Sequence, residues 1–199
     1  MATTTNYGWT TPDDTALVKD GAAAIRSLGS AIDTSMNTAL GTKKAGLVLL
    51  NTTSFSAVAS QSINDVFSST YDNYRIIINW AGSGNHDLDF RFRVSGADNS
   101  DAQYNYNDFY SITTTTSNSS TSQTLFRIGN NNTNRGIIAI DITNPFASLQ
   151  KSYFSTNWGL GRLRLQAGYF GATNSFTGFS IIPSSGTITG SVSTYGYNK

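Results

Sequence analysis

Apolar residues recur at seven-residue intervals near the start of the chain. Val18, Ile25, Ile32 and Ala39 follow this spacing, and Leu28 lies on the neighbouring seam. Because an α-helix completes a turn every 3.6 residues or so, this period places all five on one narrow edge. The pattern predicts one amphipathic helix with an apolar stripe along it.

Signals at both ends of this segment give the helix its expected bounds. Thr11 suits the N-cap, and Pro12 suits the first helical position because its missing N–H is not needed there. Gly41 can adopt the left-handed conformation that ends many helices. We expect a helical stalk over residues 12–41, preceded by an extended anchor strip over residues 1–11.

The expected helix contains many Gly, Ser, Thr and Asn residues, which are poor helix formers. A helix of this composition needs cover for its apolar stripe. We expect Val18, Ile25, Leu28 and Ile32 to form the seam of a short coiled coil between copies of the chain. The alternative is that the β domain folds back on the stripe. Ile on one seam and Leu on the other favour a parallel dimer.

From residue 46 the pattern changes to short runs of β-branched and aromatic residues between clusters of Gly, Asn, Ser and Pro. Such runs without intervening helices are typical of sandwiches and barrels. We expect a mainly β chain in which residues 46–199 form an antiparallel, jelly-roll-like β-sandwich after one N-terminal α-helix. The expected strands are 46–50, 54–59, 74–80, 87–94, 104–113, 122–128, 136–142, 149–156, 161–170, 176–182 and 187–195.

Alternation within these strands predicts which side chains enter the core. In 87–94, apolar residues occupy every second position, opposite Asp and Arg. The polar runs 111–123 and 129–136 lie between strand-like segments, and we expect both to be exposed hairpin tips. In the strand at 161–170, the expected core positions are Leu163, Leu165 and Ala167, and the expected solvent positions are Arg162, Arg164 and Gln166.

Composition narrows the classes of function. Charged residues make up 13% of the 199, and the formal net charge of +1 gives no basic field for a phosphate backbone. The chain has no Cys, which removes disulfides, thiolate chemistry and the usual zinc sites. It also lacks a long apolar run and the pattern of a signal peptide. We expect no nucleic-acid partner, no membrane partner and no conventional secretion.

Candidate catalytic and metal-binding residues are few. His86 is the sole histidine and has no nucleophile motif near it. Asp87 and Asp89 share a strand face with Arg residues, so ion pairs explain them better than acid catalysis. The turn at 98–101 offers oxygen ligands but lacks a calcium-loop spacing, and an Asx turn explains it. We expect a protein without enzymatic activity, metal or cofactor.

An aromatic cluster is the remaining candidate for recognition. Tyr104, Tyr106 and Tyr110 lie close together in the sequence, and Asn107 among them offers an amide. Aromatic faces beside amides suit sugar binding. We therefore take these four residues as candidate glycan contacts. The alternative is that the rings fill the sandwich core or a subunit interface.

A resemblance to known proteins is carried by the segment 6–29, which reads NYGWTTPDDTALVKDGAAAIRSLG. It resembles the N-terminus of tail-fibre and other fibre-like virion proteins of tailed bacteriophages, including those of cyanobacteria. The ending at 178–198, GFSIIPSSGTITGSVSTYGYN, is similar to the last strands of small phage jelly-roll structural proteins. The two segments cover the ends of the chain, and the central β region has no such likeness.

The resemblance implies a homo-oligomer, a trimer, in the phage virion. Its N-terminal segment, with Asn6, Tyr7, Trp9 and Pro12, would anchor the chain to other phage structural proteins, and its β domain would attach to a host-surface glycan. We therefore expect a fibre or spike subunit that is assembled in the host cytoplasm. The alternative is a structural protein that decorates the capsid or baseplate and has no receptor role.

Overall fold

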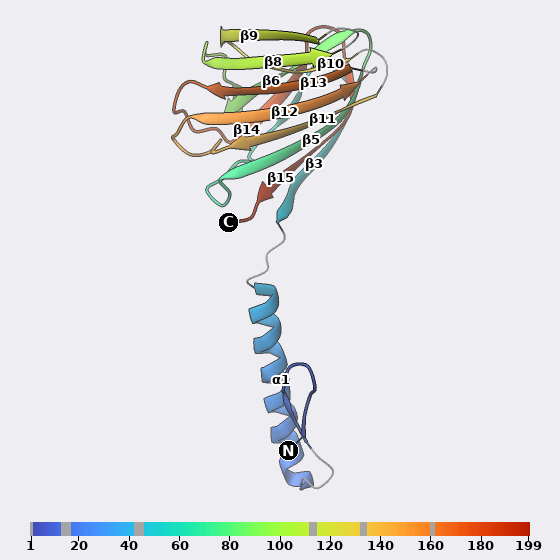
Figure 1. Cartoon of the computed structure of the whole chain (residues 1–199), viewed down its shortest axis with the longest axis vertical. Coiled ribbons are helices and arrows are strands. Elements are labelled where there is room, and N and C mark those ends of the chain that lie inside the picture. Colours follow the sequence, from blue (N-terminus) through green and yellow to red (C-terminus); the bar gives the residue numbers. More distant parts are fainter. Residues whose placement is uncertain (1, 13–16, 42–45, 112–114, 132–134, 160–161) are drawn as a thin grey trace. The chain divides into compact units, whose positions relative to one another are not determined.

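The chain divides into two compact units, Met1–Ala45 and Gly46–Lys199, and each is described by itself. The computed structural model describes residues 2–12, 17–41, 46–111, 115–131, 135–159 and 162–199 (Figure 1). The first unit contains one helix, and the second contains only strands and loops among its described residues.

The N-terminal strip folds into a hairpin. Strand β1 (Ala2–Thr3) pairs antiparallel with β2 (Thr10–Thr11). The turn between them uses Gly8 at φ 65°, a conformation that costs glycine little, and the Gly8 N–H donates to the Thr4 carbonyl at 2.9 Å. The expectation of an extended strip over residues 1–11 is therefore wrong, because Gly8 lets the chain reverse.

Helix α1 spans Val18–Gly41, so its end matches the expected one but its start does not. Thr11 belongs to strand β2 and Pro12 lies outside regular structure, so neither begins the helix. The expected start at residue 12 is wrong because the hairpin takes up the predicted N-cap. The aspartates expected in the first turn, 13 and 14, lie outside the described residues.

The hairpin covers one face of α1 (Figure 1). The indole Nε1 of Trp9 donates a hydrogen bond to Ser35 Oγ at 2.9 Å, and the Tyr7 ring stacks on Trp9 with centroids 5.0 Å apart. Within the first unit, this cover comes from the chain's own N-terminus. The half-buried residues of the helix are Gly21, Ala24, Leu28, Ala31, Ile32 and Ser35.

The second unit is built on two antiparallel sheets. The larger, eight-stranded sheet has the order β3-β15-β5-β11-β12-β13-β8-β9, and the other has β10-β6-β14-β4, with β7 paired to β6 (Figure 1). The bounds in the larger sheet are β3 Leu47–Val58, β5 Asn73–Gly82, β8 Tyr104–Ser111, β9 Thr115–Gln123, β11 Gly136–Thr143, β12 Lys151–Gly159, β13 Arg162–Phe170 and β15 Ile188–Tyr197. Those in the smaller sheet are β4 Gln61–Ile63, β6 His86–Val94, β7 Ala97–Asp98, β10 Phe126–Asn131 and β14 Gly178–Pro183.

Aromatic side chains from both sheets fill the space between them. The Phe92 ring of β6 stacks on Phe176 at 4.6 Å and meets Phe170 of β13 edge-on at 5.9 Å. Phe126 of β10 lies 4.0 Å from the Tyr153 ring of β12. Such contacts join the sheets into one hydrophobic core. The prediction of a mainly β chain, with one N-terminal helix before an antiparallel jelly-roll-like β-sandwich, is confirmed.

Some strands differ from those predicted. The polar run 111–123 was expected to be a hairpin tip, but residues 115–123 form the edge strand β9, which pairs along β8. Ser and Thr suit a solvated strand, and pairing satisfies their backbone groups, so polarity alone did not indicate a loop. The expected strands 46–50 and 54–59 are one strand, β3, because the polar residues between them keep pairing with β15.

Candidate functional site

Strand β13 shows its polar side chains to the interior, which is the reverse of the prediction. Arg164 is only 9% exposed and Gln166 is buried, whereas Leu163 is 40% exposed. The expected inside and outside faces of this strand are therefore wrong. Alternation identifies two faces but not which one is covered, and here an ion pair with Asp108 compensates the burial of Arg164.

The polar positions form two neighbouring rungs across the inner face of the larger sheet. On both rungs the side chains turn apolar at β11, where Ile138 and Ile140 are buried. Along these rungs the inner face is thus polar on β9, β8, β13 and β12, and it is apolar on β11; the polar part is called the polar region below. The first rung is Asn118, Asp108, Gln166 and Ser155, and the second is Thr116, Tyr110, Arg164 and Asn157.

An ion pair lies in the middle of this polar region. Arg164 Nε donates to Asp108 Oδ1 at 2.7 Å, and Arg164 Nη2 donates to Asp108 Oδ2. The two side chains are about nine-tenths buried or more. A guanidinium that binds a carboxylate with two parallel hydrogen bonds is held in one orientation. The pair therefore fixes the shape of the polar region.

A second ion pair comes from the smaller sheet. Arg127 of β10 contacts Asp87 at 2.9 Å and Asp89 at 3.3 Å, both on β6. Burial raises the pKa of Asp89, although Arg127 opposes this shift. Burial alone would lower the pKa of Arg127, but the two carboxylates raise it overall. Asn130, three residues after Arg127 on β10, also contacts this group, because its Nδ2 donates to Asp87 Oδ1 at 2.8 Å.

These groups line a pocket of about 340 Å³ that both sheets contribute to. Its volume lies at the lower end of the range found for small-molecule sites. Aromatic, amide, carboxylate and guanidinium groups converge on it. The lining residues are Asp87, Asp108, Tyr110, Asn118, Arg127, Asn130, Asn157 and Arg164.

One polar atom of this pocket has no partner among the described residues. Asn157 is 3% exposed, and its Oδ1 accepts no hydrogen bond there. A buried carbonyl oxygen without a donor costs about 1–3 kcal/mol, so such groups require an explanation. Because Oδ1 itself is buried, a hydroxyl or N–H group that enters the pocket would supply the missing donor only if the Asn157 side chain turned toward it.

The four candidate glycan contacts lie in different environments in the structure. Tyr104 is fully buried, its hydroxyl donates to the Asn99 carbonyl at 2.9 Å, and burial raises its pKa. Its assignment as a glycan contact is wrong, because its ring packs among core phenylalanines. Tyr106 packs half-buried against the same core, and Asn107 is exposed on the opposite strand face. Tyr110 alone lies in the pocket.

Sequence analysis missed the pocket's most informative residues, Asn157, Arg164 and Asp108. A signal for them exists in hindsight. Strands β12 and β13 are joined by a short connection, and each has polar residues at alternate positions that an antiparallel register sets side by side. Two polar stripes that coincide across a hairpin indicate either a solvated face or an internal polar site, and burial decides between them.

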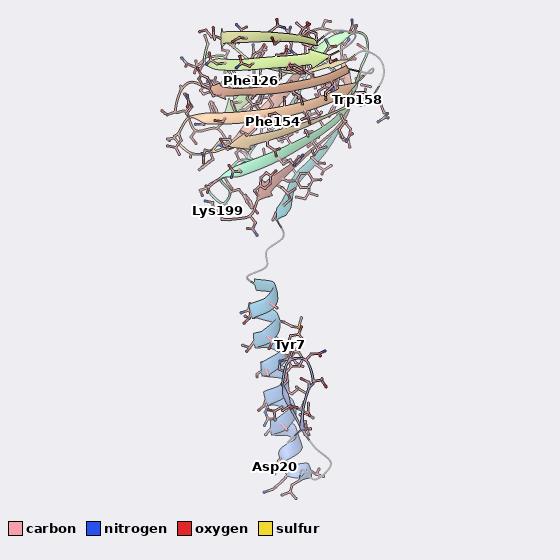
Figure 2. All side chains as sticks on the ribbon, viewed as in Figure 1. Tyr7, Asp20, Phe126, Phe154, Trp158 and Lys199 are labelled. Carbon is pink, nitrogen blue, oxygen red and sulfur yellow. The ribbon has the colours of Figure 1, made fainter. Side chains whose placement is uncertain are left out.

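The expected seam and anchor residues of the first unit differ in how exposed they are. Val18 is 96% exposed and Ile25 is mostly exposed, whereas Leu28 and Ile32 are half-buried. Half of the expected seam therefore has no cover within this unit. The anchor candidates Asn6, Tyr7 and Pro12 are exposed, and Trp9 is half-buried against α1; Tyr7 is labelled in Figure 2.

The outer face of the larger sheet carries exposed apolar side chains. Phe154 and Trp158 of β12 are marked in Figure 2, and Trp158 is 56% exposed. By register, Trp158 lies between Ile137 and Leu163 on the neighbouring strands. This outer apolar patch consists of Phe109, Ile137, Phe154, Trp158 and Leu163. A contiguous apolar patch of this kind is typical of a protein-contact surface.

His86 begins strand β6, and Asn99 and Asp101 lie between β7 and β8. His86 lies between Ser185 Oγ, 2.8 Å from Nδ1, and Ser83 Oγ, 3.3 Å from Nε2. The Asp101 backbone N–H donates to Asn99 Oδ1 at 3.3 Å, which is the hydrogen bond of an Asx turn. Within the described part of the chain, no group of three acidic or histidine side chains could hold a metal ion, and no helix is long and apolar enough to cross a membrane.

Comparisons with known proteins give distant likenesses. No family model and no curated protein matches the chain. A galectin of Caenorhabditis elegans is similar at TM-score 0.34 and 10% identity, over 75% of this chain and 95% of that one. The coat protein of Tobacco streak virus is similar at TM-score 0.22 and 10% identity, over 78% and 88%. A fructofuranosidase of Schwanniomyces occidentalis is similar at TM-score 0.23 and 8% identity, over 78% of this chain and 35% of that one. At these TM-scores the likenesses carry no argument about function.

Proposed function

We propose that this protein is a fibre or spike subunit of a phage virion that attaches to a host-surface glycan through the pocket of its β-sandwich. Its role is binding rather than catalysis. Its N-terminal unit anchors it to other phage structural proteins, and its copies associate through α1. The resemblance of segment 6–29 to phage fibre proteins supports the virion context.

One observation carries the binding role: both sheets line a pocket that brings together an aromatic ring, paired charges and Asn157, whose buried Oδ1 has no partner among the described residues. Sugars present many hydroxyls, each able to donate and accept, together with apolar ring faces. Asn157 supplies an acceptor, the ion-paired Arg127 and Arg164 retain donors, and Tyr110 offers a ring face. This set of groups matches a saccharide better than an apolar ligand.

The composition and exposure of α1 support self-association. The helix has 24 residues and contains Gly21 and Gly29 in its interior, so it is weak as an isolated helix. The hairpin covers one face, while Val18 and Ile25 remain exposed on the adjoining one. Copies of the same helix would bury that stripe. The trimeric state is supported by the resemblance to phage fibre proteins alone.

Binding of purified protein to host cells tests the attachment role. Tyr110→Ala should reduce binding at least about tenfold, because stacking and a hydrogen-bonding hydroxyl are lost together. Tyr169→Ala is the matched control, since Tyr169 is exposed on the outer face of β13, away from the pocket. Equal binding by both variants and the wild type would contradict attachment through this pocket.

The outer apolar patch favours a second candidate, a protein that decorates the capsid or baseplate without a receptor role. Exposed Phe154 and Trp158 are suited to contact with a neighbouring shell protein. Imaging of the intact particle separates the candidates. Density that covers Trp158 while no host binding is detected supports decoration, and a patch left open to solvent on a host-binding particle supports attachment.

A further inference from the structure

The charges that line the pocket are balanced within the protein. Two carboxylates, Asp87 and Asp108, and two guanidiniums, Arg127 and Arg164, give a formal lining charge of zero. Each guanidinium already contacts a carboxylate, Arg164 with Asp108 and Arg127 with Asp87. No lining residue that the structure describes therefore offers an uncompensated positive charge.

A third carboxylate makes the surroundings more negative. Asp89 is 5% exposed and contacts Arg127 Nε at 3.3 Å, so Arg127 is shared between two aspartates. An anionic group that approached Arg127 would also approach Asp87 and Asp89. Like charges at such a site disfavour binding, because the side chain of Asp89 is buried and that of Asp87 is largely buried.

Some side chains of the pocket can still form hydrogen bonds to a ligand, although their charges are balanced. A guanidinium has five N–H groups, and Arg164 uses two of them on Asp108. The buried Oδ1 of Asn157 is an acceptor without a partner among the described residues, and the Tyr110 hydroxyl can donate or accept. The pocket thus offers donors and acceptors without net charge.

We infer that the pocket selects neutral sugars, hexoses and N-acetylhexosamines, and rejects uronic acids and other anionic sugars. This inference rests on the proposed function of glycan attachment and specifies its ligand class. A ligand hydroxyl donates to Asn157 Oδ1, other ligand oxygens accept from the free N–H groups of Arg127 and Arg164, and Tyr110 contacts the ring face.

Titration with paired probes tests the selectivity. Methyl glycosides of glucose, galactose, mannose and N-acetylglucosamine form the neutral set, and methyl glycosides of glucuronic and galacturonic acid form the anionic set. Saturation-transfer NMR with the full chain reports binding, and titration gives Kd. At least one neutral glycoside should bind, and its uronate counterpart should bind at least about tenfold more weakly. Neutral binding should change less than about twofold when salt rises from roughly 0.05 M to roughly 0.5 M.

Two variants link the selectivity to named residues. Asn157→Leu removes the buried acceptor but not a used hydrogen bond of Oδ1, so it should abolish binding while Tm is unchanged or higher. Asp87→Asn removes one negative charge and keeps an oxygen for Asn130, so it should raise uronate affinity about tenfold. Asp72→Asn is its control, because Asp72 is exposed, pairs with Lys199 and lies outside the pocket.

The outcomes separate the inference from the proposed function. Uronates that bind as tightly as neutral glycosides, with binding lost in Asn157→Leu, would overturn the neutral-sugar inference and leave glycan attachment standing. Binding that Asn157→Leu does not change would place the site elsewhere and overturn the inference. If neither set binds and host cells are not bound either, both proposals fall.

Discussion

Arg164 of β13 reaches diagonally along the inner face of its sheet to Asp108 of β8, rather than to Tyr110, its direct register partner. The diagonal contact leaves Tyr110 facing the pocket and places both charges in the interior. Burying two charges is expensive unless each satisfies the other. The two hydrogen bonds between Arg164 and Asp108 offset the cost of burial, and they hold both side chains in one orientation at the pocket.

Removal of one partner of this pair should destabilise the fold. Asp108→Ala leaves the guanidinium of Arg164 buried without a carboxylate, and we expect a loss of about 3–5 kcal/mol in the free energy of unfolding. Urea denaturation of the purified chain measures it. A loss below about 1 kcal/mol would show that the pair is solvated rather than buried.

The double variant Asp108→Leu with Arg164→Met is the control for this interpretation. Because it removes both charges and keeps apolar volume, its stability should return close to that of the wild type. Its glycan binding should be lost, since the pocket loses a donor and an acceptor. A double variant as unstable as the single one would attribute the loss to packing and not to the unpaired charge.

The contrast between β6 and β13 shows how far sequence reasoning reached. In β6, alternation correctly placed Phe90 and Phe92 in the core. In β13, the same rule placed Leu163 inside and Arg164 outside, and the structure has the reverse. Alternation fixes the period of a strand but not the identity of its covered face, which depends on long-range pairing with β8 and β12. The fold class was predictable because it needs only the period.

The polar pocket could not be derived in the same way. Its residues come from three parts of the sequence, β6, β8 to β10, and β12 with β13, and their meeting depends on strand order. Tyr110 was selected because of a local aromatic cluster that is mostly core. Local composition thus found one lining residue, whereas the unpartnered acceptor of Asn157 is visible only when burial is known.

Gly168 allows two strands and a tyrosine to approach closely. A Cβ at this position would lie 2.3 Å from the Asn105 carbonyl oxygen and 2.7 Å from the Tyr153 ring. Since the nearest atom is backbone, it cannot move aside alone, and Gly168→Ala should cost about 3 kcal/mol or more. Gly171→Ala is the control, because its nearest atom is the flexible Gln103 side chain. Thermal denaturation that ranks the two variants equally would contradict this account.

Lys151 should make the free energy of unfolding depend on pH in the alkaline range. Its ammonium group donates to the Ala147 carbonyl at 2.8 Å, and burial lowers the pKa of Lys151 to about 8. Between pH 8 and the usual lysine pKa of about 10.4, the unfolded chain binds this proton more tightly than the folded chain. The free energy of unfolding should therefore rise above pH 8, by at most about 1.4 kcal/mol per pH unit.

Urea denaturation from about pH 7 to about pH 11 measures the effect. Lys151→Met should flatten the profile, and Lys199→Met should retain the rise because Lys199 is largely exposed. Above about pH 10 the profile should turn down, since burial raises the pKa of Tyr104 and Tyr153, which stay protonated only in the folded chain. A rise that persists in Lys151→Met would assign it to another group.

The Trp9 indole should hold the hairpin on the helix. Trp9→Phe keeps an aromatic ring but removes the hydrogen bond to Ser35, worth about 1 kcal/mol, so amide exchange in α1 should speed up at least about fivefold. Trp9→Ala also removes the ring that stacks on Tyr7 and should speed exchange further. Hydrogen exchange resolved by peptide measures this, with the strands of the second unit as an internal reference. Unchanged exchange in both variants would show that the hairpin does not stabilise the helix.

The exposed stripe of α1 should determine the oligomeric state. Ile25 is 65% exposed, so Ile25→Asp should hardly disturb a single chain but should place a charge inside a bundle of copies. Light scattering after size-exclusion chromatography should give three times 21.4 kDa for the wild type and 21.4 kDa for Ile25→Asp. Ser27→Asp is the control, because Ser27 lies on the opposite side of the helix and should leave the oligomer intact. A wild-type chain that runs as a monomer at all concentrations would remove the reason for proposing a stalk, whereas a dimer would keep the seam and correct its number of copies.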